Sequence, residues 1–264
     1  MKNHLKVLFV VSLVFIFSCR SSKDLIYLND AANAEIIKSL PVQNTEHILK
    51  NGDILYISIK SINPEVNTLF NPESNMESTT GGAGFQKFTT PSGAYLYGFE
   101  IDQDGNLKLP MFGKIKVSGI PTSQAESVVQ KRADELLNDA IVKVKLLNFK
   151  VTVLGEVRSP GDYYNYNNSM TVIEALAMAS GNTDYASIKR VMVLRSLPEG
   201  SKTFLLDLNS KEIYSSEAFY LQPNDYIIVQ PDKYKYFQLN SQIISISFSS
   251  LSILLVTLGL LLRL

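Results

Sequence analysis

The organisation of this chain follows from residues 102–125, which run Asp102-Gln-Asp-Gly-Asn-Leu-Lys-Leu-Pro-Met-Phe-Gly-Lys-Ile-Lys-Val-Ser-Gly-Ile-Pro-Thr-Ser-Gln-Ala125. Asp104-Gly105-Asn106 consists of residues that tolerate a left-handed backbone, so it predicts a tight turn between two extended runs. After the turn, apolar residues alternate with lysine as far as Val117, which is the period of a strand with one buried face. We therefore expect a β-hairpin.

A helix is predicted directly after this hairpin. Gly119-Ile120-Pro121 ends the second strand, and Ser123 and Glu126 have the spacing of a capping box. Six apolar residues then recur at helical spacing: Ala125, Val128, Val129, Ala133, Leu136 and Leu137. The stretch therefore predicts a β-meander that leads into an amphipathic helix.

The same stretch resembles a family signature. The string D-G-N-L-K-L-P-x-x-G-K-I-K-V-x-G-x-x-x-x-Q-A over residues 104–125 is similar to that of the Wza-like outer-membrane polysaccharide export lipoproteins. In that family a Leu-x-x-Gly-Asp turn opens the export domain, and Leu49-Lys50-Asn51-Gly52-Asp53 fits it. A similar run, residues 221–225, precedes a late apolar strand, which indicates one local device used twice. The resemblance implies an export domain over residues 46–148.

A second module is predicted over residues 149–232. The apolar phase shifts near Leu146-Leu147, which indicates a bulge or a domain junction. The string G-E-V-x-x-P-G-x-Y that begins at Gly155 resembles the start of the soluble-ligand-binding β-grasp (SLBB) domain. Thr171 and Glu174 form a second capping box, so we expect one helix on a small sheet. The expected fold class is α+β: a small export domain of β-meander plus helix, a β-grasp module and a C-terminal transmembrane helix.

Six residues are expected at structural turns of these two modules: Gly52, Asp53, Gly105, Gly155, Pro160 and Gly161. Gly155 and Gly161 are expected to occupy backbone positions that are closed to other residues.

The beginning of the chain resembles a lipoprotein signal. An apolar run over residues 7–17 follows two lysines and is too short to cross a bilayer. Residues 16–19 resemble a lipobox, which implies a signal peptide over residues 1–18 and a lipid on Cys19. The alternative is a plain signal peptide with an incidental cysteine. Residues 19–45 are predicted to be a tether, and residues 63–92 a flexible loop rich in Gly, Pro and Ser.

The last segment, residues 233–264, is predicted to be a transmembrane helix, because residues 243–262 carry no charge and are long enough to cross a hydrocarbon core. On a helical wheel, polar and small residues form one stripe: Gln238, Ser241, Gln242, Ser245, Ser249, Ser252 and Gly259. The stripe either lines water in a ring of helices or allows close helix packing. The sequence leaves both alternatives open.

The inventory of reactive side chains argues against an enzyme. After signal removal the chain holds one histidine, His47, and no free thiol if Cys19 is lipidated, so triads and multi-histidine metal sites are excluded. We expect no cofactor and no metal. Lys+Arg 25 balances Asp+Glu 25, which gives no indication of nucleic-acid binding. Tyr163, Tyr164 and Tyr166 either stack on sugar or lie in a core.

The resemblance therefore implies a non-enzymatic, lipid-anchored component of a capsular or exopolysaccharide exporter in the bacterial outer membrane, with its folded domains in the periplasm. A single helix cannot enclose a polar path, so a conduit requires a ring of copies. The expected partners are polysaccharide, further copies of the chain and an inner-membrane polysaccharide co-polymerase or tyrosine kinase. The alternatives are a lipid-anchored glycan-binding receptor and a scaffold without a pore.

Overall fold

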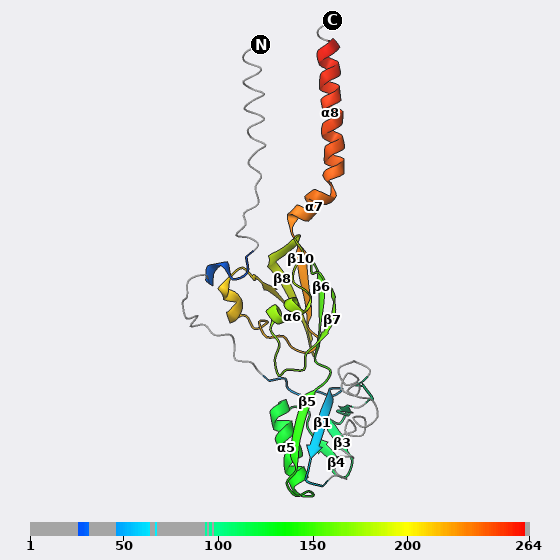
Figure 1. Ribbon diagram of the computed structural model, residues 1–264, viewed down its shortest axis with the longest axis vertical. Helices are drawn as coiled ribbons and strands as arrows, with labels where there is room; N and C mark the ends of the chain where they lie inside the picture. The colour runs from blue at the N-terminus through cyan, green and yellow to red at the C-terminus, as the bar shows by residue number, and fades with distance from the viewer. Residues whose placement is uncertain are drawn as a thin grey trace.

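Two folded domains and a projecting helix make up the structure, a computed structural model (Figure 1). The residues described are 26–31, 46–63, 67, 93, 95–96 and 98–261. The predicted signal peptide, Cys19 and nearly all of the predicted loop over residues 63–92 lie outside them. The first domain lies at the end of the molecule away from the projecting helix, and the second domain lies between the two.

Among the described residues, the first domain is built on the strands β1 (Ile54–Lys60), β2 (Phe99–Glu100), β3 (Asn106–Leu109), β4 (Gly113–Lys116) and β5 (Ile141–Leu146) and on the helix α5 (Thr122–Asp134). β1 is the centre of an antiparallel sheet in the order β2-β1-β5, and β3 pairs with β4. An isolated bridge from Ile101 to Leu107 continues β2 into β3. The predicted β-meander that leads into a helix is therefore present.

Helix α5 packs on the sheet of the first domain, but it is not capped as predicted. Its N-cap is Pro121, which makes no side-chain cap hydrogen bond. Ser123 Oγ donates instead to Glu46 Oε2 at 2.5 Å, and Glu126 Oε2 accepts from the backbone N of Val144 at 2.9 Å. The capping-box prediction is wrong because β5 is an edge strand with outward N–H groups, which the side chains of α5 satisfy.

The buried face of α5 agrees in part with its predicted stripe. Ala125, Val129 and Ala133 are buried in the core of the first domain. Leu136 is exposed, because the helix ends at Asp134 before the stripe is complete. The core thus lies between α5 and the sheet that contains β1 and β5.

The second domain contains five strands and two short helices: β6 (Lys150–Gly155), β7 (Gly161–Tyr164), α6 (Val172–Met178), β8 (Ala186–Leu197), β9 (Gly200–Leu206), η5 (Lys211–Ser215) and β10 (Tyr226–Pro231). The sheet order is β7-β6-β10-β8-β9, and β10 runs parallel to β6 and antiparallel to β8. A hairpin, a crossover helix and a last strand inserted beside the first give the arrangement of a β-grasp sheet.

Helix α6 begins with the predicted capping box. Glu174 N donates to Thr171 Oγ1 at 3.2 Å, and Thr171 N donates to Glu174 Oε2 at 2.7 Å. Val172, Ala175 and Leu176 of the helix are buried against the sheet. The local signal therefore positions the helix correctly, because its apolar stripe and its cap agree.

The two domains meet where the apolar phase shifts in the sequence. β5 ends at Leu146 in one sheet and β6 begins at Lys150 in another. The connection folds back on β1, because Leu147 N donates to Ile54 O at 2.8 Å and Ile54 N donates to Asn148 Oδ1 at 3.1 Å. The change of sheet explains the phase shift at Leu146-Leu147.

Residues 26–31, within the stretch predicted as a tether, are fixed to the second domain. We call them the N-terminal clip; they include the 3-10 helix η3 (Asn29–Ala31). Leu28 N donates to Leu208 O at 2.9 Å, and the carboxylate of Asp30 accepts from Lys211 N at 2.7 Å. Leu28 also packs against the core of the second domain. Over these residues the chain is therefore bound to the second domain and does not act as a tether.

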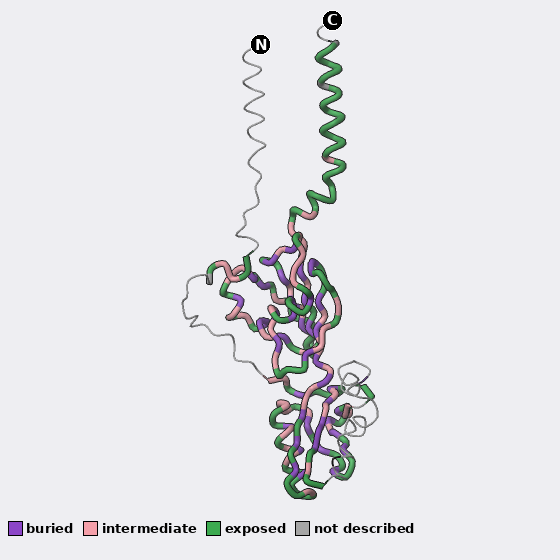
Figure 2. The backbone as a smooth tube through the Cα atoms, viewed as in Figure 1, coloured by how far each residue is buried: buried purple, intermediate pink, exposed green. Residues whose placement is uncertain are grey.

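Two helices follow β10: α7 (Lys233–Leu239) and α8 (Ser241–Leu261). They change direction at Asn240, and α8 projects away from the second domain (Figure 1). Its described side chains are almost all exposed, as Figure 2 shows by the green tube. By length and composition, residues Ser241–Leu260 suffice to cross a membrane. Gln238 lies on α7, so the predicted stripe does not run along one straight helix.

Candidate functional site

Two turns with the same geometry open a strand in each domain. Asp53 Oδ2 accepts from the backbone N of Lys50 at 2.9 Å, and Asp225 Oδ2 accepts from the backbone N of Gln222 at 2.8 Å. In each turn the aspartate N also donates to the carbonyl of the residue three positions earlier, at 3.1 Å. The similarity seen in the sequence is therefore one local device used in both domains.

The residue before each aspartate needs a left-handed backbone. Gly52 has φ +85° and Asn224 has φ +67°. The N–H of Gly52 donates to Ile101 O at 2.9 Å, and the N–H of Asn224 donates to Lys150 O at 2.7 Å. Each turn thus also fastens a neighbouring strand, which gives both turns a structural role.

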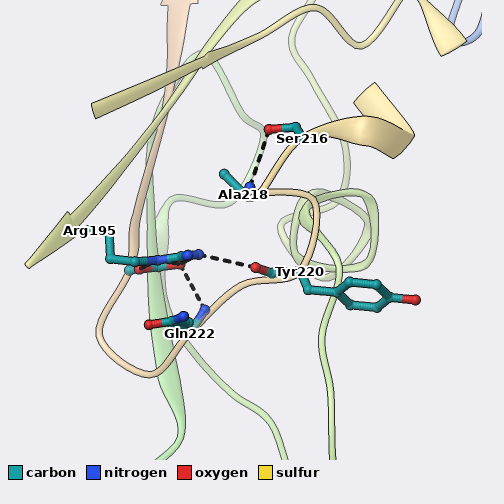
Figure 3. A network of polar contacts seen from close by, with 6 residues as sticks. Arg195, Ser216, Ala218, Tyr220 and Gln222 are labelled. Atoms are coloured by element: carbon teal, nitrogen blue, oxygen red, sulfur yellow. Dashed lines mark hydrogen bonds and ion pairs between the residues drawn. The ribbon is translucent and has the colours of Figure 1, made fainter. Parts of the chain in front are cut away.

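A buried ion pair completes the turn in the second domain. Figure 3 shows its arginine, Arg195, beside Tyr220 and Gln222. Arg195 Nη2 lies 2.7 Å from Asp225 Oδ2, and Arg195 Nε lies 3.0 Å from Asp225 Oδ1. The guanidinium also donates to the backbone O of Tyr220 at 3.1 Å, and Gln222 N donates to the same carboxylate. This pair holds the connection between η5 and β10 in place, and its hydrogen bonds give the carboxylate of Asp225 a structural role.

His47 has the corresponding position in the first domain. Its Nε2 lies 2.7 Å from Asp53 Oδ2, and both side chains are about nine-tenths covered. The histidine therefore fastens the Leu49–Asp53 turn, and its partner is a structural carboxylate. Among the described residues there is no cluster of His, Cys, Asp and Glu that would hold a metal ion.

The glycines of the predicted turns differ in whether the structure leaves room for another residue at their position. Gly155 has φ +88°, and a Cβ there would lie 2.1 Å from the backbone O of Val229. Gly105 has φ +78°, and a Cβ there would clash with the side chain of Lys116. Gly161, which follows Pro160 and begins β7, has no left-handed backbone and open space beside its Cα. The expectation that Gly161 is closed to other residues is wrong.

An ion pair joins α7 to the second domain. Lys235 Nζ donates to Glu156 Oε1, and Thr183 Oγ1 donates to Glu156 Oε2 at 2.6 Å. The hydrogen bond from Lys235 and then that from Thr183 hold the pKa of Glu156 below its ordinary value. Asp232 N also donates to Tyr185 O at 2.7 Å. The base of the projecting helix is thus fixed to the sheet.

The hydroxyls of α8 bond within the helix. Ser249 Oγ donates to Ser245 O at 2.8 Å, and Ser252 Oγ donates to Phe248 O at 2.8 Å. Three hydroxyls outside the predicted stripe do the same: Ser247, Ser250 and Thr257. The structure thus places Ser245, Ser249 and Ser252 on an exposed helix whose polar residues extend beyond the stripe. The hydroxyl donors of Ser249 and Ser252 are satisfied without a partner helix or water.

The three candidate tyrosines separate. Tyr163 packs against the core and its hydroxyl donates to Ser159 O. Tyr164 is half-buried, whereas Tyr166 is 43% exposed. Further exposed aromatic side chains lie on α7, namely Tyr234, Tyr236 and Phe237. Of the three predicted tyrosines, Tyr166 offers the most ring surface to a ligand.

Comparison with known proteins now gives the family. Residues 41–147 match the family model described as polysaccharide biosynthesis/export protein, and residues 149–229 match the SLBB domain. The chain belongs to the polysaccharide export protein family. Its first domain is the export domain and its second domain is the SLBB domain. The match of the two adjacent models agrees with the resemblance of the two motif strings.

Named relatives point the same way. The chain is 29% identical over 115 residues to the EPS I polysaccharide export outer membrane protein EpsA of Ralstonia nicotianae, a match that covers 42% of this chain and 29% of the relative. It is 31% identical over 153 residues to the polysialic acid transport protein KpsD of Escherichia coli, which covers 54% of this chain and 26% of that protein. The match thus spans less than a third of each relative.

Sequence reasoning missed the contacts that connect distant segments of this export protein. Lys235 and Glu156 are 79 positions apart, and Asp30 and Lys211 are 181 positions apart. A charged residue beside a helix start gives no signal of its distant partner. The Asp225 turn was visible as a pattern, but the arginine that neutralises it, Arg195, lies on another strand and carries no local signature.

Proposed function

We propose that this chain is a subunit of an outer-membrane exporter of capsular polysaccharide or exopolysaccharide. The family is one of polysaccharide export, which fits a non-enzymatic role, and the relatives are named as export and transport proteins. The observation that carries the proposal is an export domain and an SLBB domain followed by a helix long and apolar enough to cross a membrane. Transport then consists of passage, without turnover of a substrate.

In this proposal several copies form the conduit. A single α8 cannot enclose a polar path, because a lone helix has no interior, so a ring of copies is required. The stripe that includes Ser245, Ser249 and Ser252 would face the lumen of that ring. An SLBB sheet that fixes α7 through Lys235 supports the proposal, since it sets the direction in which α8 leaves each copy.

Both proposed membrane attachments leave the SLBB domain. Cys19, proposed as the lipidated residue, precedes the N-terminal clip by seven residues, so a lipid on its sulfur lies within about 25 Å of Ile26. On the other attachment, Tyr234, Tyr236 and Phe237 are exposed just before α8 begins. Aromatic side chains are enriched where a membrane protein crosses the headgroup layer. We place the SLBB domain next to the membrane, on the periplasmic side.

The export domain then points away from that membrane. It lies at the end of the molecule opposite α8 (Figure 1). In this orientation it is the part that would meet an inner-membrane polysaccharide co-polymerase or tyrosine kinase across the periplasm. The exposed turn of the β3–β4 hairpin, at Pro110 and Met111, would be available for that contact.

One observation favours an anchored receptor without a pore as the second candidate. Because the hydroxyls of Ser249 and Ser252 donate to backbone carbonyls of their own helix, these two side chains can face lipid in a single copy. In that case α8 is a second anchor, and the folded domains hold a glycan.

A deletion strain and a mass measurement test the proposal together. We expect loss of surface polysaccharide when the gene is deleted, and recovery with the wild-type gene. We also expect native mass spectrometry of the detergent-extracted protein to give a multiple of the chain mass. A variant truncated after Leu239 is the control, since it keeps both domains and lacks α8. Normal secretion of polysaccharide by the deletion strain would contradict the export role. A protein that is monomeric in detergent and binds glycan would favour the receptor.

A further inference from the structure

Two adjacent cavities lie between the export domain and the SLBB domain. Their volumes are about 150 Å³ and 200 Å³, and Glu46, His47, Phe149 and Asn168 line both. We call the two together the interdomain cleft. Each is smaller than a drug-sized pocket of about 300–1,000 Å³, and side by side they reach the lower end of that range. The cleft thus has room for a small ligand and not for a folded partner.

One wall of the cleft is a loop whose backbone is held in place. The buried amide of Asn165 donates to Asn167 O at 3.1 Å and to Ser169 O at 3.0 Å. Its Oδ1 accepts from Asn167 N at 3.0 Å. These three bonds fix the loop, so Tyr166, Asn167 and Asn168 reach the cleft from a preorganised backbone. Preorganisation of this kind lowers the entropy cost of binding.

The opposite wall comes from the export domain. Ser123 Oγ donates to the half-buried carboxylate of Glu46, at 2.5 Å from Oε2. Lys145 Nζ donates to Asn168 Oδ1 at 2.7 Å, across the boundary between the domains. The cleft is therefore lined by two carboxylates and two ammonium groups, together with hydroxyls, amides and the imidazole of His47, next to the exposed ring of Tyr166. Because both signs of charge are present, the cleft favours a neutral polar ligand over a polyanion.

We propose that the interdomain cleft binds a neutral saccharide unit, one or two sugar rings in length. The face of Tyr166 packs on the C–H groups of a ring, while Asn167 and Glu46 exchange hydrogen bonds with its hydroxyls. A ligand there touches both domains, so it fixes the angle between them. The proposal rests on the proposed export function for the source of the sugar, but the site itself is defined by its own residues.

Calorimetry on the full chain in detergent micelles tests the site. The probe is a mixture of short oligosaccharides made by partial acid hydrolysis of the surface polysaccharide of the bacterium that encodes the chain. We expect Tyr166→Ala and Asn167→Ala each to raise the Kd for the oligosaccharides by about tenfold, which is the effect of one lost stacking or hydrogen-bonding contact. Tyr166→Phe retains the ring and should bind within about threefold of the wild type.

The matched control is Asn138→Ala, an exposed asparagine of the export domain outside the cleft. A second measurement uses Tyr166→Trp, because the chain contains no tryptophan and the fluorescence of this variant reports the cleft alone. We expect the oligosaccharides to shift its emission.

The results separate this site from the export role. Equal Kd values for Asn167→Ala and Asn138→Ala, or no heat and no emission shift with any variant, would overturn the cleft as a saccharide site. If the wild-type gene still restores secretion in the deletion strain, the export proposal stands in either case. Conversely, normal secretion without the gene would contradict export, while the binding data would still decide the cleft.

Discussion

Arg195 and Asp225 lie 30 positions apart and meet as a buried, two-pronged ion pair, with 2.7 Å between Nη2 and Oδ2. The side chains are only 8% and 1% exposed, so neither charge has much access to water. The pair joins β8 to the turn before β10, and these two strands hold the centre of the SLBB sheet. Removal of one partner leaves the other charge buried and uncompensated.

Asp225→Asn should therefore destabilise the SLBB domain by about 3–5 kcal/mol, the usual cost of breaking a buried pair from one side. Hydrogen exchange of the β6, β8 and β10 amides, followed by mass spectrometry, measures the effect within the full chain. Asp53→Asn is the matched control, because His47 and Asp53 occupy the equivalent turn at a more accessible place. Equal protection of the SLBB strands in the wild type and Asp225→Asn would contradict the prediction.

Gly155→Ala should cost about 1–3 kcal/mol, because the new Cβ meets Val229 O and the backbone is left-handed. The clash lies where β6 and β10 pair in parallel. Gly161→Ala, with open space beside it, should change stability by about 0.5 kcal/mol or less. Thermal unfolding of both variants measures this difference in stability. Similar losses of stability in the two variants would show that the space around the new Cβ does not determine the cost of the substitution.

The ion pair between Glu156 and Lys235 predicts a pH dependence. The folded-state pKa of Glu156 is below its ordinary value of 4.5, chiefly because Lys235 donates to it. The stabilisation is therefore complete above pH 4.5 and is lost as pH falls through the lower folded-state pKa. We expect the difference in unfolding free energy between wild type and Glu156→Gln to be present at pH 7 and to disappear in acid. Glu199→Gln, at the exposed β8–β9 turn, should give a difference near zero throughout.

Ser249→Lys and Leu254→Lys distinguish a pore from simple anchoring. In a ring with the stripe inward, lysine at Ser249 enters a polar lumen, and oligomers should assemble with altered transport. Lysine at Leu254, off the stripe, should cost about 2.5–3.5 kcal/mol in the membrane centre and prevent assembly. Native mass spectrometry gives the oligomeric state of each variant. Equal loss of assembly in both would leave only the anchoring role for α8.

Tyr236→Trp measures the depth of α7 in a membrane. The chain has no tryptophan, so the emission comes from one position. If α7 lies in the headgroup layer, lipids brominated near the glycerol should quench this emission more than lipids brominated at the chain ends. Tyr226→Trp, at the other end of β10, should be quenched by neither. Equal, weak quenching of both variants would show that α7 stays in water.

Local signals in the sequence were sufficient for the elements of the fold. The alternation after Gly105 predicted β3 and β4, and Thr171 with Glu174 marked the start of α6, because cap and apolar stripe involve neighbours along the chain. Ser123 and Glu126 had the same local pattern and behaved differently. The carboxylate of Glu126 instead accepts a hydrogen bond from the backbone N–H of Val144, on a strand 18 positions further on. The unpaired N–H groups of this edge strand thus bind the side chain that the pattern had assigned to the helix cap.

The candidate site was less accessible from sequence, because its parts come from both domains. Tyr166 was singled out as an aromatic residue, but Glu46 and Lys145 face it only after the domains are assembled. Gly155 and Gly161 look alike in a motif, and only the backbone angles separate them. Residues 26–31 have no period of their own, and their attachment to residues 208–211 combines backbone hydrogen bonds with contacts of the Asp30 carboxylate to a segment about 180 positions away, which no local pattern signals.

The position of β10 in the SLBB sheet decides how the domain bears mechanical load. α8 follows β10 through α7, so a pull on α8 is transmitted along this strand. β10 is the central strand, bonded to β6 on one side and to β8 on the other. A force along its length loads both rows of hydrogen bonds in shear, so they must break together. A load on α8 is therefore borne by the central strand of the sheet, and the edge strands β7 and β9 carry none of it directly.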